Sequence, residues 1–276
     1  MALRINTNVA SVFAQKHTSR TQERLQSNFE HLSSGLRITK AADDAAGLAV
    51  SEGMRAEIRS LHQASRNTND GISMVQSAEG ALSEVTNIVS RMRELAVEAS
   101  SGVMQATERA YMATEFTALQ SEIDRISSTT NFNGLQLADG STASVDVQVG
   151  IFDTANDRIT VSLQDSRGVT LGIDVLSADL TTAGTAQTAI TALDTALDSI
   201  NNSRATLGAA QNRLTSATHN LENYTENLVE AESRIRDVDF AQETADLTRN
   251  QIFSQAGVAV LAQSNQSPQT ALSLLQ

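Results

Sequence analysis

The fold of this chain is decided by residues 193–238, LDTALDSINNSRATLGAAQNRLTSATHNLENYTENLVEAESRIRDV. Apolar side chains recur in this stretch at alternating steps of three and four residues. The positions are Leu193, Ala196, Ile200, Leu207, Ala210, Leu214, Ala217, Leu221, Tyr224, Leu228, Ala231, Ile235 and Val238, interrupted at Ser203. Such a repeat predicts one long helix that packs along its length against partner helices as a coiled coil.

The N-terminal half contains candidate partner helices. A second apolar stripe comprises Met54, Ile58, Leu61, Ile72, Val75, Leu82, Val85, Val89, Met92, Ala96 and Ala99, and a third comprises Met112, Phe116, Leu119, Ile123 and Ile126. SSG at 100–102 predicts the turn between them. We expect a bundle whose seam brings Leu207, Leu214, Leu221, Leu228 and Ile235 against Val75, Leu82 and Val89.

The middle of the chain changes its period from helical to alternating. Val145, Val147 and Val149 alternate with polar residues, as do Ile159, Val161 and Leu163 after the turn-forming DTAND at 153–157. This pattern predicts a β-hairpin. A further strand is expected at 169–173. The predicted fold class is therefore mainly α, an elongated helical bundle and coiled coil of the N- and C-terminal segments with a small β-hairpin region in the middle.

Composition excludes several classes of function. The net charge of −12 and the pI near 4.7 argue against nucleic acid and anionic membranes as partners. The absence of cysteine removes disulfide scaffolds, thiol catalysis and cysteine-based zinc sites. No stretch predicts membrane insertion as a helix, and no cleavable signal peptide can be recognised at the N-terminus. We expect a soluble chain, or one exported by a route that needs no removable signal.

Both ends of the chain are poor in charge. No charged residue follows Arg249, and the first fifteen residues contain only Arg4. One interpretation is disordered tails, and the other is amphipathic segments that become ordered only in an assembly. The second predicts an assembly interface formed by Ile5, Val9, Val12, Phe13, Leu32, Leu36, Ile252, Phe253, Val258, Leu261, Leu272 and Leu275.

Nothing in the sequence has the pattern of an active site. Asp43 and Asp44 are adjacent and lack a third carboxylate at ligand spacing, so we expect them to bond helix N-terminal donors or arginines. The four histidines are far apart, and the phosphate-binding, nucleophile-elbow and dinucleotide-binding motifs are absent. We therefore expect no enzyme activity, no metal and no cofactor.

Several blocks closely resemble bacterial flagellin. They are INTNVASVFAQ at 5–15, LSSGLRITKAADDAAGLAVSEGMRAEI at 32–58, NTNDGISMVQSAEGALSEV at 67–85, RMRELAVEASSG at 91–102, EIDRIS and NFNGLQL within 122–137, LGAAQNRL, SRIRDVDFAQETADLTRNQI and LAQSNQSPQTALSLL. The blocks follow the family's order, and the similarity spans about 1–140 and 185–276. The family's outer variable domains are missing, so the resemblance is to a short form.

The resemblance implies a structural subunit that self-assembles into the bacterial flagellar filament for swimming. In flagellins the ends form an inner coiled coil that is disordered in the monomer, here 1–44 with 236–276. A helical rod domain would comprise 45–131 with 182–235, and its β-hairpin region 132–181. Such subunits are secreted unfolded through the flagellar channel and function outside the cell.

The resemblance also implies partners. These are further copies of the chain, the filament cap, the hook-junction proteins and an export chaperone on the C-terminal tail. Arg91, Leu95 and Glu115 match positions at which the animal Toll-like flagellin receptor recognises many flagellins. Two alternatives remain at this point: a hook–filament junction protein, and a soluble coiled-coil scaffold.

Overall fold

The computed structural model describes residues 8–173 and 180–273, with side chains described as far as residue 266. Five helices account for most of these residues: α1 (Val9–Ser34), α2 (Ala45–Ala99), α3 (Ala106–Thr129), α4 (Ala183–Arg236) and α5 (Phe240–Ser273). The strands are β1 (Asn131–Phe132), β2 (Leu135–Gln136), β3 (Ser144–Gln148) and β4 (Arg158–Ser162), and a short 3₁₀ helix, η1, covers Ala155–Asp157. The predicted mainly α fold class is confirmed.

The chain divides into two compact units. The terminal unit comprises Met1–Ile58 and Glu226–Gln276, and the central unit comprises Arg59–Thr225. The long helices α2 and α4 contribute to both. The predicted division into an inner coiled coil, a helical rod and a hairpin region stays a prediction.

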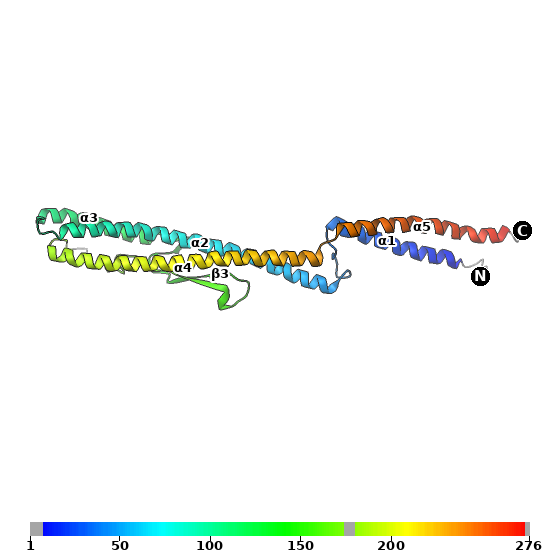
Figure 1. The fold of residues 1–276 in the computed structure, drawn as a ribbon, viewed down its shortest axis with the longest axis horizontal. Coiled ribbons are helices and arrows are strands. Elements are labelled where there is room, and N and C mark those ends of the chain that lie inside the picture. The colour runs from blue at the N-terminus through cyan, green and yellow to red at the C-terminus, as the bar shows by residue number, and fades with distance from the viewer. Residues whose placement is uncertain (1–7, 174–179, 274–276) are drawn as a thin grey trace. The chain divides into compact units, whose positions relative to one another are not determined.

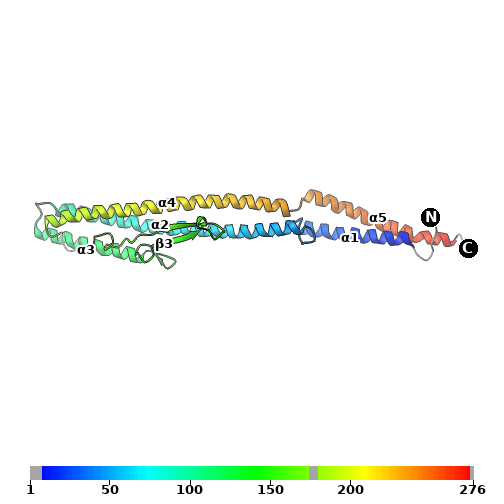
Figure 2. The same cartoon turned by 90° about the horizontal axis from the view of Figure 1, so that it is seen from below.

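The central unit is a helical bundle with one apolar core. In Figures 1 and 2, α3 and α4 lie along α2. Val75, Leu82 and Val89 of α2 are buried in the same cluster as Leu207 and Leu214 of α4. Leu221 is buried too, while Leu228 and Ile235 in the terminal unit are half-buried.

Two positions of the apolar repeat at 193–238, Tyr224 and Val238, are not part of a buried helical seam. Tyr224 is 41% exposed and lines a surface groove beside Phe152, at the turn of the hairpin. Val238 lies beyond the end of α4, where its N–H donates to the carbonyl of Gly35 at 3.0 Å. The helical repeat therefore extends to Arg236 and stops before the last apolar position of the pattern.

The hairpin is confirmed in its register. β3 and β4 are antiparallel, with Val145 opposite Val161 and Val147 opposite Ile159. Val147 packs closely on α2, because a Cβ added to Gly71 would lie 3.0 Å from its side chain. Glycine at this position of α2 therefore lets the sheet approach the helix.

A smaller hairpin precedes it. β1 and β2 are joined by Asn133 and Gly134, whose φ angles of 49° and 81° are both left-handed, as a tight hairpin turn requires.

The strand expected at 169–173 is absent from the described residues. That segment is a turn in which Leu171 N–H bonds the carbonyl of Arg167 at 3.0 Å and Ile173 N–H bonds that of Gly168 at 2.9 Å. Gly172 has a φ of 73°, which breaks the extended backbone. The alternating apolar pattern arises because Leu171 and Ile173 turn inward to the core.

Candidate assembly interface

In the terminal unit, α1 and α5 pack side by side through small and polar residues (Figures 1 and 2). The seam positions that lose solvent include Ser11, Ala14, Thr18, Thr21, Leu25, Asn28 and Leu32 along α1, and Glu243, Leu247, Asn250, Ser254, Gly257, Leu261 and Ser264 along α5. A Cβ on Gly257 would lie 2.8 Å from Thr18 Oγ1, so this glycine permits a close approach of the two helices. The spacing is that of a coiled coil, but most of the seam lacks large apolar side chains.

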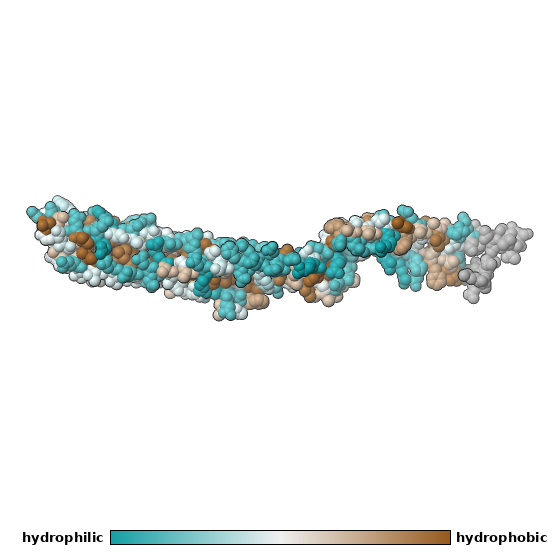
Figure 3. All heavy atoms as spheres, in the orientation of Figure 1, coloured by the Kyte–Doolittle hydropathy of each residue, from teal (hydrophilic) through white to brown (hydrophobic). Residues whose placement is uncertain are grey.

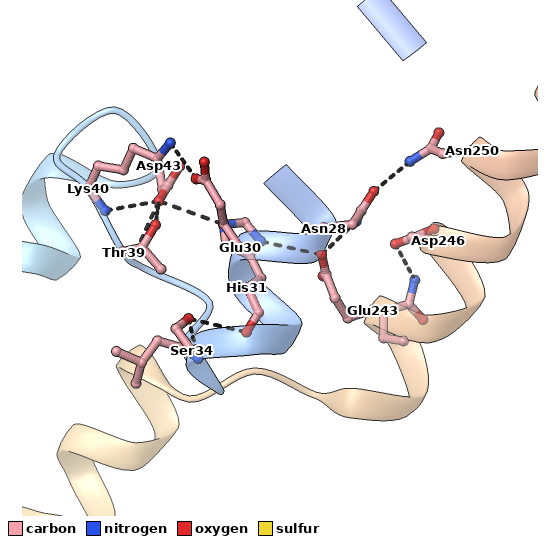
Figure 4. Close-up of polar contacts among 12 residues, drawn as sticks. Asn28, Glu30, His31, Ser34, Thr39, Lys40, Asp43, Glu243, Asp246 and Asn250 are labelled. Carbon is pink, nitrogen blue, oxygen red and sulfur yellow. Dashed lines mark hydrogen bonds and ion pairs between the residues drawn. The ribbon is translucent and has the colours of Figure 1, made fainter. Parts of the chain in front are cut away.

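Polar side chains join the two helices at both ends of the seam. Near the N-terminus, Ser11 Oγ donates to Asn265 Oδ1 at 2.9 Å, and Asn8 Nδ2 donates to the carbonyl of Ser264 at 2.8 Å. Near the C-terminal end of α1, Asn28 accepts from Asn250 Nδ2 at 2.8 Å and donates to Glu243 Oε1 at 2.5 Å (Figure 4). Buried polar groups need such partners, so these bonds fix the register of the pair.

His31 connects α1 to two other segments (Figure 4). Its Nδ1 lies 3.3 Å from Glu243 Oε1 of α5, and its Nε2 lies 3.7 Å from Asp43 Oδ2 in the loop before α2. Partial burial works against the charged form of Asp43. The backbone N–H groups of Lys40 and Thr39, the Thr39 hydroxyl and nearby His31 outweigh it and lower the pKa of Asp43. The loop is thus held to α1 by an ionised carboxylate.

The next residue has the structural role expected of it. Asp44 Oδ1 accepts from the backbone N–H of Gly47 at 2.9 Å, so its carboxylate occupies the N-terminus of α2. The described residues contain no group of three or more histidine, cysteine or acidic side chains able to hold a metal ion.

The two loops that interrupt the helices of the terminal unit lie side by side. The loop after α1 and the loop between α4 and α5 form a β-bridge at Leu36 and Asp237. Arg37 N–H donates to the Arg236 carbonyl at 2.7 Å beside it.

Large apolar side chains of the terminal unit face outward. Phe13 and Val12 on α1 are each 59% exposed, and Ile252 on α5 is 58% exposed. The other exposed members of this apolar surface are Val9, Phe29, Phe240, Phe253, Val258 and Val260. Figure 3 shows apolar patches of this kind, in brown, over α5. Ile38 is the single buried apolar residue of this unit among the residues described.

A groove opens beside this surface between α1 and the loop that follows it. It has a volume of about 900 Å³, and its walls include Leu25, Phe29, Thr39 and Lys40. Lys40 Nζ pairs with Glu30 Oε2 at 2.5 Å on its rim, and this hydrogen bond raises the pKa of Lys40. The groove therefore offers an apolar floor with a charged edge.

The predicted interface residues fall into three groups. Val9, Val12, Phe13, Ile252, Phe253 and Val258 are exposed on the terminal unit. Leu32, Leu36 and Leu261 are half-buried. Ile5, Leu275 and the side chain of Leu272 lie outside the described residues.

Sequence reasoning missed the polar seam itself. Asn28, His31, Glu243 and Asn250 were not singled out, although they link α1 with α5. The signal was available, because positions 250, 254, 257, 261 and 264 follow the same steps of four and three as a coiled coil. Their side chains are small or polar, so a search for large apolar residues passes over them.

The predicted receptor residues occupy one part of the central unit. Arg91 Nε donates to Glu115 Oε1 at 3.0 Å, and both side chains are about half exposed. Leu95 is 2% exposed and lies in the core beneath them.

A chain of two helical units, one of which exposes large apolar side chains, has the features of a subunit that associates with further chains. The family model of the bacterial flagellin N-terminal helical region matches residues 5–143, and that of the C-terminal helical region matches residues 190–275. The chain is 46% identical over 272 residues to a flagellin of Halalkalibacterium halodurans, covering 99% of each chain. It is 43% identical over 284 residues to the 33 kDa flagellar filament core protein of Treponema phagedenis, covering 99% of each.

A solved structure supports the same family. A crystal structure of Bacillus cereus flagellin matches with 36% identity and a TM-score of 0.51, covering 56% of this chain and 88% of that one. This chain belongs to the bacterial flagellin family. It is a structural subunit of the flagellar filament and not an enzyme. Within the described ranges we find no helical segment whose length and hydropathy together suit a lipid bilayer.

Proposed function

We propose that the terminal unit is the surface through which copies of this flagellin join in the filament. The outward position of its large apolar side chains supports this proposal. Phe13, Ile252 and Phe253 are each more than half exposed, while the contact between α1 and α5 is made largely by small and polar groups. An arrangement of this kind leaves the apolar surface for other chains to cover.

The magnitudes favour association with several neighbours. Full burial of a large apolar side chain is worth about 1.5–3 kcal/mol, so covering six half-exposed ones contributes roughly 6 kcal/mol. Association costs about 4–15 kcal/mol. For an interface with a single neighbour, the free energy gained by burying these side chains is therefore close to the cost of association. Several neighbours around one subunit make the assembled state favourable.

We infer the division of the chain into domains from the same surface. We place 1–44 with 236–276 as the inner coiled coil of the filament, 45–131 with 182–235 as the rod domain, and 132–181 as its hairpin region. The bridge between Leu36 and Asp237, in the two loops that interrupt the helices, supports the boundary between the inner coiled coil and the rod domain. In a monomer the inner coiled coil would lack its neighbours, which fits export of the subunit unfolded and assembly outside the cell.

Further partners belong to the same proposal. An export chaperone would cover residues about 250–276, where the exposed Ile252, Phe253 and Val258 lie. The filament cap and the hook-junction proteins would meet the same terminal unit at the two ends of the filament.

The experiment tests Phe253→Ser against Val103→Ser in the full chain, using seeded assembly followed by sedimentation and electron microscopy. Val103 is a matched control, because it is 85% exposed but lies in the central unit. We expect Phe253→Ser to raise the critical concentration at least about tenfold, which corresponds to about 1.4 kcal/mol, and Val103→Ser to leave it unchanged. Equal assembly of the parent and Phe253→Ser would exclude the terminal surface as the interface.

A second function, recognition by the animal Toll-like flagellin receptor, is supported by the exposed pair Arg91 and Glu115. Leu95, the third predicted contact, is 2% exposed, so we assign it the role of supporting these side chains from the core and not of touching the receptor. Arg91→Ala monomers should signal less strongly than the parent in receptor-bearing cells, and Arg125→Ala serves as the control because Arg125 is an exposed arginine, also ion-paired, on α3. Undiminished signalling by Arg91→Ala would exclude the assignment.

A further inference from the structure

A stripe of basic residues follows the apolar surface along α1. Lys16, Arg20 and Arg24 are exposed and four residues apart. They continue the side of the helix occupied by Val9 and Phe13, since 9, 13, 16, 20 and 24 follow helical steps of four and three. In the described part of the chain none of the three cations forms an ion pair, and Glu23 beside them forms none either.

An acidic stripe with the same spacing lies on α4. Glu222, Glu226 and Glu230 are exposed, on the side of the helix opposite Leu221 and Leu228. The two outer carboxylates each have a neighbour on the same helix: His219 Nδ1 lies 3.5 Å from Glu222 Oε2, and Arg234 Nη1 lies 2.5 Å from Glu230 Oε1. The middle residue, Glu226, makes no ion pair with a described residue.

The like charges within each stripe repel one another, and on α4 the pair of Glu230 with Arg234 offsets only part of this repulsion. Like charges four residues apart face one another on a helix and destabilise it. An opposite stripe placed alongside removes this repulsion from both helices. The two stripes match in length, because three residues at steps of four span about 12 Å on each helix.

We propose that Lys16, Arg20 and Arg24 of one copy pair with Glu222, Glu226 and Glu230 of a second copy. The inference rests on the proposed self-assembly through the terminal unit, because the basic stripe adjoins the apolar surface of that unit. The two stripes are different surfaces of the same chain, so their contact leaves one of each free and propagates as an open polymer. Charge complementarity of this kind fixes the register between subunits more than it adds affinity.

The test uses charge reversal and rescue in the full chain, with seeded assembly as the readout. Arg20→Glu places an acid opposite Glu226, and we expect the critical concentration to rise about tenfold. Adding Glu226→Arg restores an attractive pair in the reversed sense and should return the critical concentration to within about twofold of the parent.

The matched control is Arg20→Glu with Glu84→Arg. Glu84 is an exposed acid on α2, and this double variant has the same net charge as the parent and as the rescue variant. It should remain defective. Circular dichroism of each monomer checks that the central unit is folded, and it should be unchanged because all three residues are exposed.

Three results would overturn the pairing: normal assembly of Arg20→Glu, failure of Glu226→Arg to rescue it, or equal rescue by Glu84→Arg. Each is distinct from failure of the proposed function, which is reported by Phe253→Ser. If Phe253→Ser is defective and Glu226→Arg does not rescue, the apolar interface stands and the charge pairing is wrong.

Discussion

The terminal and central units have the same helical repeat, but different kinds of side chain occupy its positions. In the central unit the repeat is filled by residues such as Val75, Leu82 and Leu214, all 5% exposed or less. In the terminal unit the corresponding positions of α1 and α5 are mainly serine, threonine, asparagine and glycine, and the large apolar residues point outward. The comparison shows that two units can share one helical spacing and differ in where their large apolar side chains lie.

The largest expected effect is on the core of the central unit. Leu214→Ala removes a fully buried side chain and should lower the free energy of unfolding by about 2–5 kcal/mol, because a cavity remains. Val258→Ala, at a 55% exposed position of the terminal unit, should change it by less than about 0.5 kcal/mol. Urea unfolding of the two monomeric variants measures both. Similar losses for both would remove the contrast between the units.

The polar seam should matter chiefly in the assembled state. Asn28→Ala removes a partner of Asn250 and of Glu243, which costs about 1–3 kcal/mol for the buried groups left behind. A loss of 1 kcal/mol raises the critical concentration about fivefold. Ser19→Ala on the exposed side of α1 is the control and should have no effect. A critical concentration unchanged by Asn28→Ala would show that the polar bonds do not fix the helix pair.

Acid should weaken the central unit through Asp165. A hydrogen bond from Arg167, assisted by Thr170, lowers the pKa of Asp165 to about 2. A depressed pKa in the folded state means that the stabilising contribution is complete above pH of about 4 and is lost as the pH falls toward about 2. The stability lost over this window should be smaller in Asp165→Asn than in the parent, as urea titrations at several pH values would measure. Solvent screening keeps the difference modest. Identical pH dependence of the two proteins would contradict the assignment.

The smallest effects separate two glycines of α2. Gly80 has open space where a Cβ would be, so Gly80→Ala should stabilise the chain by about 0.5–1 kcal/mol through helix propensity. Gly71→Ala gains the same propensity but places its Cβ 3.0 Å from Val147 of the hairpin. It should therefore be less stabilising than Gly80→Ala in thermal unfolding. Equal stabilisation by the two substitutions would show that Val147 of the hairpin can shift away from the added Cβ without loss of stability.

Much of the fold could be predicted from local pattern. The repeats of α2, α3 and α4, the β3–β4 pairing and the turn at Asn133–Gly134 all depend on spacing and backbone preference within short segments. The failed strand at 169–173 shows the limit of this reasoning. Two residues alternating toward a core can belong to a turn as well as to a strand, and Gly172 decided between them through its positive φ.

The candidate site was predicted only in part. Uncharged ends with regularly spaced apolar residues indicated an assembly surface, and the exposed positions of Val12, Phe13 and Ile252 are consistent with it. The bonds from Asn28 to Glu243 and Asn250 could not be predicted, because they join residues more than two hundred positions apart.

By itself, the sequence determined that this chain is helical, that its helices carry coiled-coil seams, and, through its similarity, that it belongs to the flagellins. Those properties follow from short-range periodicity and from residue identity. Only the tertiary structure decided which side of α1 and α5 faces inward. A helix with both a small polar stripe and a large apolar stripe can bury either, and in this chain Gly257 and the asparagines bring the small stripe into the pair and leave the apolar one outside.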